Sequence, residues 1–198
     1  MRIRKICYVV TIPTTIRSFF MSQLQYLAKH GFDVSVICAR DEKLLEDMGN
    51  GIHYIPTDIP RGISFGGSIK AVKELINIFK REKFDLIQYS TPNAALYASI
   101  AAKIVGCKIR NYHLMGFRYL GAHGIGKSIL KTIEKVSCWN STSIECVSRS
   151  NLELGIKEKV FPAEKATVVW NGSTGGVNLE RFDYFKRDVW RNKLREEL

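Results

Sequence analysis

Apolar residues follow two alternating patterns along this chain. Short, almost continuous apolar runs are typical of buried strands, and the longer segments between them repeat their apolar residues every three or four positions, as helices do. Strands that alternate with helices and are apolar throughout predict an α/β fold, with a doubly wound parallel sheet and helices on both faces. We expect about seven strands, at residues 3–11, 34–39, 52–56, 84–89, 108–114, 143–147 and 167–170.

Capping residues predict where the helices begin. Ser18 and Ser68 each precede an apolar stripe with helical spacing, and Thr91-Pro92 opens an Ala-rich segment. Ser150 and Glu153 have the spacing of a capping box. A further helix is expected over residues 127–139, with its apolar side chains facing the core: Ile129, Leu130, Ile133 and Val136.

The carboxyl ends of the strands are the expected ligand-binding edge, because parallel α/β sheets bind ligands there. The loops at this edge are residues 11–17, 89–92, 114–126, 147–150 and 171–176. Residues 1–170 are expected to form one Rossmann-like domain. The Gly-, Asn-, Ser- and Thr-rich segment after Trp170 is typical of an ordered junction, so we interpret residues 171–198 as a hinge and the start of a second domain.

Charge points to an anionic partner. The chain has 30 Lys and Arg against 19 Asp and Glu, a net charge of +11, which favours nucleic acid, anionic lipid or pyrophosphate. Nucleic acid is disfavoured, since no helix-turn-helix or zinc pattern occurs and the basic residues are not interleaved with aromatic ones. The alternative is a basic protein that is simply soluble.

Cysteine spacing and hydropathy bear on the compartment. The five cysteines are scattered without a Cys-x-x-Cys pair, so neither a disulfide framework nor a metal site is expected. No apolar run approaches the roughly 20 residues that span a bilayer. The apolar run at residues 7–12 is also too short for the core of a signal peptide. We therefore expect a cytoplasmic protein.

Three lysines recur every four residues in the helix expected over 127–139. Lys127, Lys131 and Lys135 would form one cationic ridge beside its apolar stripe. A solvated helix face is the ordinary interpretation. Together with Arg118 and the net charge, the ridge favours contact with an anionic surface, either a bilayer or a pyrophosphate group.

Gly121 to Ser128 match the phosphate-loop pattern G-x-x-x-x-G-K-S. The preceding strand is expected to end near Leu114, however, and no later strand ends in an Asp that would complete a nucleotide site. A glycine loop that starts a helix is favoured, and a phosphate-loop nucleotide-binding protein remains an alternative.

The histidines do not cluster in sequence. His113 and His123 bracket the loop after the fifth strand, where a histidine can act as an acid, a base or a phosphate donor, or be purely structural.

Several segments, taken in order, resemble the amino-terminal domain of the family-4 glycosyltransferases, which are retaining enzymes of the GT-B fold. The branch that builds bacterial capsule and other surface polysaccharides is the most similar. The matching segments are residues 19–27 with 31–34, 90–94, 116–119, 147–150, and 171–173 with 176–182.

The resemblance implies a division of labour between two domains. The amino-terminal domain would bind a lipid-linked saccharide acceptor at the inner face of the plasma membrane, and the carboxy-terminal domain would hold the nucleotide-sugar donor with a Glu-x₇-Glu motif. Two pairs with that spacing, Glu74/Glu82 and Glu145/Glu153, are interpreted as coincidences. The nucleotide sugar is a substrate, so no cofactor is implied, and the chain alone is expected to be inactive.

The resemblance also suggests residues that line the cleft, although it identifies none as catalytic. Arg118 would donate to a phosphate or sugar oxygen from a glycine-containing loop. Met115 stands where relatives often have His or Arg, and His113 is expected on the opposite side of the strand. The cleft residues are Thr11, Pro13, Ser90, Thr91, Gly116, Arg118, Asn171 and Gly172.

The sequence therefore predicts the acceptor-binding half of a glycosyltransferase that moves a sugar from a nucleotide sugar to a lipid-linked saccharide. The alternatives are the phosphate-loop protein and a non-catalytic binding module on the same sheet.

Overall fold

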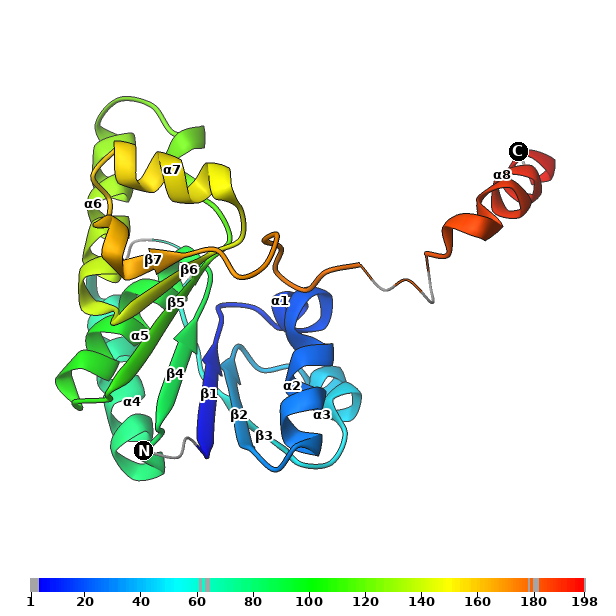
Figure 1. Cartoon of the computed structure of the whole chain (residues 1–198). Helices are drawn as coiled ribbons and strands as arrows, with labels where there is room; N and C mark the ends of the chain where they lie inside the picture. Colours follow the sequence, from blue (N-terminus) through cyan, green and yellow to red (C-terminus); the bar gives the residue numbers. More distant parts are fainter. Residues whose placement is uncertain (1–3, 61, 63–64, 178, 180–181, 198) are drawn as a thin grey trace.

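A seven-stranded, wholly parallel sheet forms the centre of the molecule (Figure 1). The computed structural model describes residues 4–60, 62, 65–177, 179 and 182–197. The strand order is β3-β2-β1-β4-β5-β6-β7, which confirms the predicted doubly wound sheet. The strands are β1 (Lys5–Val9), β2 (Asp33–Cys38), β3 (Ile52–Pro56), β4 (Leu86–Tyr89), β5 (Ile109–Leu114), β6 (Ser143–Cys146) and β7 (Ala166–Thr167).

Helices cover both faces of this sheet (Figure 1). Most follow a strand directly, as in right-handed βαβ units. The α-helices are α1 (Pro13–Thr15), α2 (Met21–Lys29), α3 (Glu42–Met48), α4 (Phe65–Glu82), α5 (Pro92–Ile104), α6 (Gly124–Asn140), α7 (Arg149–Lys157) and α8 (Arg187–Glu196). A π-helical turn η1 (Ile16–Phe20) joins α1 to α2, and three 3₁₀ turns are η2 (Arg118–Gly121), η3 (Ala163–Lys165) and η4 (Tyr184–Lys186).

The sheet separates two apolar clusters. On one face Phe20 and neighbouring side chains of η1, α2 and α3 pack against β1 and β2, where Val36 is fully buried. On the other face α4, α5 and α6 pack against β4 and β5. Ala98 is fully buried in α5, whose small alanines let it lie closely between α4 and α6. Near-continuous apolar strands are needed because both faces of β1 and β4 are covered.

Three of the predicted helix starts are wrong. The first helix begins at Pro13 rather than Ser18, since proline suits the first helical position, and Ser18 lies inside η1. Ser68 lies inside α4, and its hydroxyl contacts the Tyr97 hydroxyl at 2.8 Å. Ser148, not Ser150, caps α7 by accepting a hydrogen bond from the Asn151 N–H at 3.2 Å.

Among the other predicted boundaries of helices and strands, one is confirmed and the last strand differs. Thr91 is the residue before α5, as predicted. The first strand begins at Lys5 within the described residues, while Ile3 lies outside them. The last strand was expected at residues 167–170, but it spans only Ala166–Thr167, and Trp170 adopts a left-handed φ of 52° beyond it.

The inward face of α6 also differs from the prediction. Ile129 is 47% exposed, whereas Glu134 is buried and 2% exposed. The Tyr112 hydroxyl of β5 donates to Glu134 Oε1 at 2.6 Å, which explains how a carboxyl group is accommodated there.

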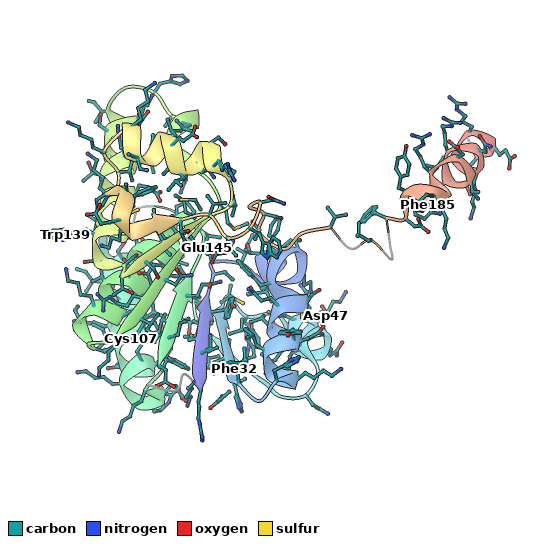
Figure 2. All side chains as sticks on the ribbon, in the orientation of Figure 1. Phe32, Asp47, Cys107, Trp139, Glu145 and Phe185 are labelled. Atoms are coloured by element: carbon teal, nitrogen blue, oxygen red, sulfur yellow. The ribbon has the colours of Figure 1, made fainter. Side chains whose placement is uncertain are left out.

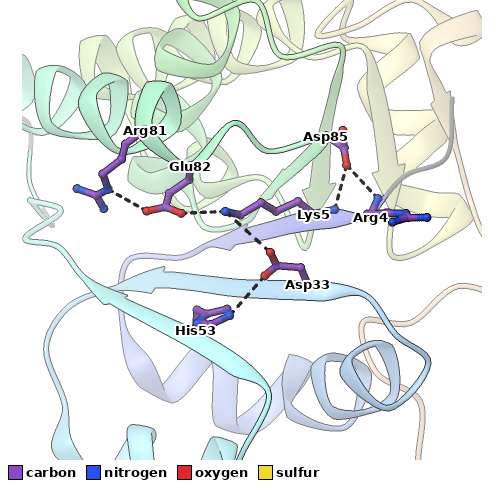
Figure 3. A network of polar contacts seen from close by, with 7 residues as sticks. All are labelled: Arg4, Lys5, Asp33, His53, Arg81, Glu82 and Asp85. Carbon is purple, nitrogen blue, oxygen red and sulfur yellow. Dashed lines mark hydrogen bonds and ion pairs between the residues drawn. The ribbon is translucent and has the colours of Figure 1, made fainter.

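Charged side chains close the amino edge of the sheet (Figure 3). Lys5 Nζ lies 2.9 Å from Glu82 Oε2 and 3.9 Å from Asp33 Oδ2. The Asp85 carboxylate accepts the backbone N–H groups of Arg4 and Lys5 at 2.9 and 3.0 Å. These contacts lower the pKa of both Glu82 and Asp85.

Beyond β7 the chain passes through a segment that we call the connector, residues 168–177, and ends in α8, which has no buried side chain. Within the described residues, the helices lack the combination of length and hydropathy that membrane spanning requires.

Candidate functional site

The carboxyl edge of the sheet at β1 and β4 is the switch point of the fold, since the chain runs outward from these two strands in opposite directions. Thr11 follows β1 and Ser90 follows β4, and they are only 8% and 1% exposed. The Ser90 N–H donates to the Val9 carbonyl at 3.0 Å, so the loop after β4 begins beside the loop after β1.

Thr11 and Thr91 join these two loops. The Thr91 hydroxyl oxygen accepts the Thr11 backbone N–H at 3.2 Å and lies 2.8 Å from the Thr11 hydroxyl. Thr91 has a φ of 68°, which is unfavourable for a β-branched residue. Such backbone strain concentrates at ligand-binding and active sites, where the surrounding structure maintains it.

Arg118 reaches this edge from the loop after β5. Its Nη1 atom donates to Asn93 Oδ1 at 3.3 Å, and Asn93 belongs to the first turn of α5. The Asn93 amide donates in turn to the carbonyls of Pro60 and Gly62 at 2.6 and 3.2 Å. Arg118 is exposed, so its guanidinium retains donors that can bind an anionic or hydroxylated ligand.

The connector crosses the same edge of the sheet (Figure 1). The Ser173 N–H donates to the Val147 carbonyl at 2.7 Å, immediately beyond β6. Gly172 has a φ of 81°, and a Cβ there would overlap the Val147 carbonyl oxygen. A Cβ on Gly175 would lie 2.8 Å from the Phe19 carbonyl oxygen. Glycine at both positions therefore allows the connector to lie against two backbone segments.

A cavity of about 500 Å³ lies between the connector and the first helical segment. Its lining is mixed in polarity. Arg17, at its wall, already contacts Asp41 at 2.8 Å and Asp47 at 2.5 Å. The remaining lining residues are Ser18, Phe19, Met21, Ser22, Gln23, Ser173, Thr174, Gly175, Gly176, Val177 and Phe182.

A polar pair lies on β5 and β6 next to this edge, where the sheet aligns His113 with Glu145. His113 Nδ1 is 3.3 Å from Glu145 Oε2, and the imidazole ring packs edge-on against Phe20. His113 is 2% exposed, and neither of its ring nitrogens forms a hydrogen bond of good geometry with the described residues. Contact with His113, and secondarily with Asn111, lowers the pKa of Glu145 against the opposing effect of burial.

The structure gathers most of the predicted cleft residues at one edge. Thr11, Ser90 and Thr91 are neighbours, and Arg118 reaches them through Asn93. Pro13 is buried at the start of α1. The remaining three are Gly116, in the loop before Arg118, and Asn171 and Gly172, in the connector.

One detail differs from the expectations. His113 and Met115 were expected on opposite sides of the strand, yet both pack against the cluster around Phe20, as a spacing of two residues requires. At Gly116 a Cβ would meet nothing within 4 Å, so the space there would accept a side chain.

Sequence reasoning named His113 as a candidate but missed its contact with Glu145 and the contact of Asn93 with Arg118. The available signal was that these residues lie near the carboxyl ends of β4, β5 and β6. The register that pairs His113 with Glu145 is a property of the assembled sheet.

The lysine ridge of α6 is interrupted. Lys131 Nζ lies 2.7 Å from Glu158 Oε2 and 5.6 Å from the centre of the Tyr119 ring. Lys127 and Lys135 are exposed. Because the middle lysine is neutralised, the ridge does not form one continuous cationic surface.

The phosphate-loop pattern does not sit directly between a strand and a helix. β5 ends at Leu114 and α6 begins at Gly124, with η2 folded between them. Gly121 closes η2, so the glycines do not form one loop wrapped around the helix start. The phosphate-loop alternative is not favoured.

The part of the chain that the structure describes contains no group of three or more His, Cys, Asp and Glu side chains suited to holding a metal ion. All five cysteines are buried free thiols.

The parallel sheet, its switch point and the connector define a Rossmann-like domain of the GT-B type. A family model described as Glycosyltransferase Family 4 matches residues 18–174. The chain belongs to this family.

Two curated relatives agree with this assignment. A capsular polysaccharide biosynthesis glycosyltransferase, CapM of Staphylococcus aureus, is 30% identical over the whole chain and 50% of its own length. A UDP-Gal:alpha-D-GlcNAc-diphosphoundecaprenol alpha-1,3-galactosyltransferase of Escherichia coli is 24% identical over 90% of the chain and 46% of its own length. The chain spans about half the length of the curated relatives it matches.

Solved structures show the same fold at low sequence identity. A glycosyltransferase from Rickettsia africae is 16% identical over 100% of the chain and 50% of its own length, with a TM-score of 0.67. HepE of Anabaena, crystallised with UDP and glucose, is 16% identical over 98% of the chain and 50% of its own length, with a TM-score of 0.66.

Proposed function

We propose that the chain is the acceptor-binding half of a retaining glycosyltransferase that transfers a sugar from a nucleotide sugar to a lipid-linked saccharide. The observation that carries the proposal is the convergence of Thr11, Ser90, Thr91 and Arg118 at the switch-point edge of a family-4 domain. Arg118 offers an exposed guanidinium, a donor that binds sugar hydroxyls and phosphate oxygens, and the contact between Thr11 and Thr91 joins the two central loops.

The relatives support the substrate class. The name of the Escherichia coli relative includes a diphosphoundecaprenol acceptor, and that of the Staphylococcus aureus relative includes capsular polysaccharide. A product of surface polysaccharide synthesis is therefore the proposed outcome, with the enzyme in the cytoplasm, peripheral to the inner face of the plasma membrane. No metal or other cofactor is included in the proposal.

The cleft residues have different proposed roles. Arg118 binds a phosphate or sugar oxygen of the acceptor, and Asn93 holds the guanidinium in place. Thr11 and Thr91 keep the two central loops together, with Ser90 and Gly116 beside them. Asn171 and Gly172 form a hinge to a donor-binding half that begins within residues 171–198.

The test is transfer by the full-length enzyme with a panel of nucleotide sugars and a lipid-linked acceptor. Arg118→Ala is expected to lower kcat/KM for the acceptor about tenfold or more, the effect of losing one charge-assisted hydrogen bond. Arg81→Ala is the matched control, because Arg81 is exposed at the opposite edge of the sheet. Equal rates for both variants would contradict the role of Arg118. Measurable transfer by the 198-residue chain alone would contradict the division into two halves.

A further inference from the structure

An apolar cavity of about 620 Å³ opens on the outer flank of the molecule, between α6, α7 and η3. Val160 and Phe161 form its floor and are 5% and 4% exposed. Trp139 and Ile156 stand at its rim, where they are 74% and 38% exposed. A large indole ring left in water beside an apolar cavity is costly, which marks this surface for contact with something else.

Lysines surround this cavity. Lys103 Nζ lies 4.7 Å above the centre of the Trp139 ring, and Lys135 and Lys159 line the rim. Lys165 also lines it but donates to the carbonyls of Cys138 and Trp139 at 2.9 and 3.0 Å, so it caps the end of α6.

The cavity contains no carboxylate among its lining residues. Glu158, the acid on the neighbouring stretch of chain, lies 2.7 Å from Lys131 and is already neutralised. Glu164, in the middle of η3, is exposed and is not among the residues that line the cavity. The surface is therefore both apolar and cationic, and the partner that complements it is both apolar and anionic.

This surface is separate from the candidate cleft. Figure 2 shows Trp139 on the flank of the molecule that lies away from the connector. The connector therefore leaves the cavity uncovered. We define the Trp139 patch as Trp139, Ile156, Lys103, Lys135 and Lys159.

We propose that the Trp139 patch rests on an anionic lipid bilayer. Tryptophan favours the headgroup level of a bilayer, since its ring is apolar and its N–H is polar. Lysines beside it can place their ammonium groups among lipid phosphates while their alkyl stems lie along the apolar surface. The patch shares Lys135 with the interrupted ridge, but it lacks Lys127 and the neutralised Lys131. The inference rests on the proposed function, because a lipid-linked acceptor gives the contact its purpose.

The test is binding of the 198-residue chain to vesicles, measured by co-sedimentation. We expect binding to phosphatidylglycerol-containing vesicles, weaker binding to phosphatidylcholine vesicles, and a loss of binding as salt is raised. Trp139→Ala should weaken binding about tenfold, the effect of withdrawing roughly 60 Å² of apolar surface from the bilayer. Lys159→Glu should weaken it about thirtyfold, since it replaces an attraction by a repulsion.

Two control variants separate the patch from other surfaces. Trp170→Ala removes a tryptophan that is 88% exposed in the connector, and it should leave binding unchanged. Lys127→Glu reverses the first lysine of the ridge and should have a much smaller effect than Lys159→Glu. Brominated lipids should quench the fluorescence of Trp139 in a chain that carries Trp170→Phe and Trp190→Phe.

Several results would contradict contact of the Trp139 patch with a bilayer. Vesicle binding that survives both Trp139→Ala and Lys159→Glu would overturn the proposal, as would binding lost only in Lys127→Glu. Failure to bind vesicles, with binding to an acidic amphipathic peptide, would assign the patch to a protein partner instead. Because no transfer is measured, a failure here leaves the proposed activity standing. A full-length enzyme without transfer activity would affect the proposed function and not the vesicle result.

Discussion

Glu82 and Asp85 at the amino edge of the sheet differ sharply from Glu134, which is buried in the middle of α6. The first two meet a lysine or backbone N–H groups near solvent (Figure 3), and both have a lowered pKa. Glu134 lies against the Tyr112 phenol, and burial raises its pKa to about 7. Glu145 lies against His113. The amino edge is thus held by charges that stay fixed near neutral pH, whereas α6 contains a buried carboxyl group that titrates there.

The largest expected effect is at Glu134. Its folded-state pKa of about 7 exceeds the ordinary value of 4.5, so the folded chain holds the proton more tightly. Stability is therefore full below the ordinary pKa and falls as pH rises towards 7, by about 3 kcal/mol at most. Glu134→Gln keeps an acceptor for the Tyr112 hydroxyl and should remove this fall.

Urea unfolding at pH 5 and pH 8 measures the change for the wild type and for Glu134→Gln. Glu153→Gln, at an exposed position of α7, serves as the control and should behave like the wild type. A wild type that is equally stable at both pH values would contradict the role given to Glu134.

A substitution at Thr91 measures how much uncharged hydrogen bonds stabilise the carboxyl edge of the sheet. Thr91→Val keeps the side-chain shape but loses the hydrogen bonds to the Thr11 N–H and hydroxyl, and should cost about 2 kcal/mol of unfolding free energy. Thr57→Val is the matched control, since the buried Thr57 hydroxyl has no hydrogen-bond partner among the described residues. It should be neutral or slightly stabilising in the same thermal or chemical unfolding experiment. Equal losses at both positions would mean that threonine shape, not hydrogen bonding, matters.

His113 and Glu145 should show energetic coupling. Glu145→Ala removes the carboxylate that lies 3.3 Å from the buried His113 Nδ1 atom, at a cost of about 1–2 kcal/mol. His113→Phe removes the polar ring and preserves an aromatic contact with Phe20, so the double variant should recover much of the loss. A double-mutant cycle by urea unfolding measures this, and strictly additive losses would show that the pair is not coupled.

The smallest effect is expected at the amino edge. The lowered pKa of Asp85 means that its contribution is present above the ordinary aspartate pKa of about 3.9 and is lost as pH falls through the folded value. Asp85→Asn should cost about 1 kcal/mol at pH 7, because the amide oxygen accepts the two N–H groups less strongly. Thermal unfolding at pH 6 and pH 3 checks it. The difference in stability between Asp85→Asn and the wild type should shrink at pH 3. A difference that grew at pH 3 would contradict a stabilising role for the ionised Asp85 carboxylate.

The fold was predictable because its apolar pattern is local and repeated. Each strand of the parallel sheet is covered on one or both faces, so seven apolar runs were visible in order. Thr91 before Pro92 also identified the start of α5, since the preference of proline for the first turn depends only on neighbouring residues.

Two of the missed helix starts had local signals that were overlooked, since Pro13 and Ser148 compete with Ser18 and Ser150. Other missed features depend on distant parts of the chain. Glutamate usually occupies exposed positions, and the burial of Glu134 depends on the hydroxyl of Tyr112, which is 22 residues away in the sequence. The candidate site was predicted at the level of loops. Its pairings, such as Arg118 with Asn93, required the assembled sheet.

The close fit of Gly172 and Gly175 against neighbouring backbone has a consequence for exchanging parts between related enzymes. Both glycines lie against backbone of this domain, at the carbonyls of Val147 and Phe19. A hybrid gene joined after Gly176 would keep both contacts together, whatever sequence follows. One joined before Gly172 would take both positions from the other enzyme, and any side chain that it brought would find no room there. Viable hybrids should therefore tolerate a junction on the carboxyl side of this short stretch and reject one on its amino side.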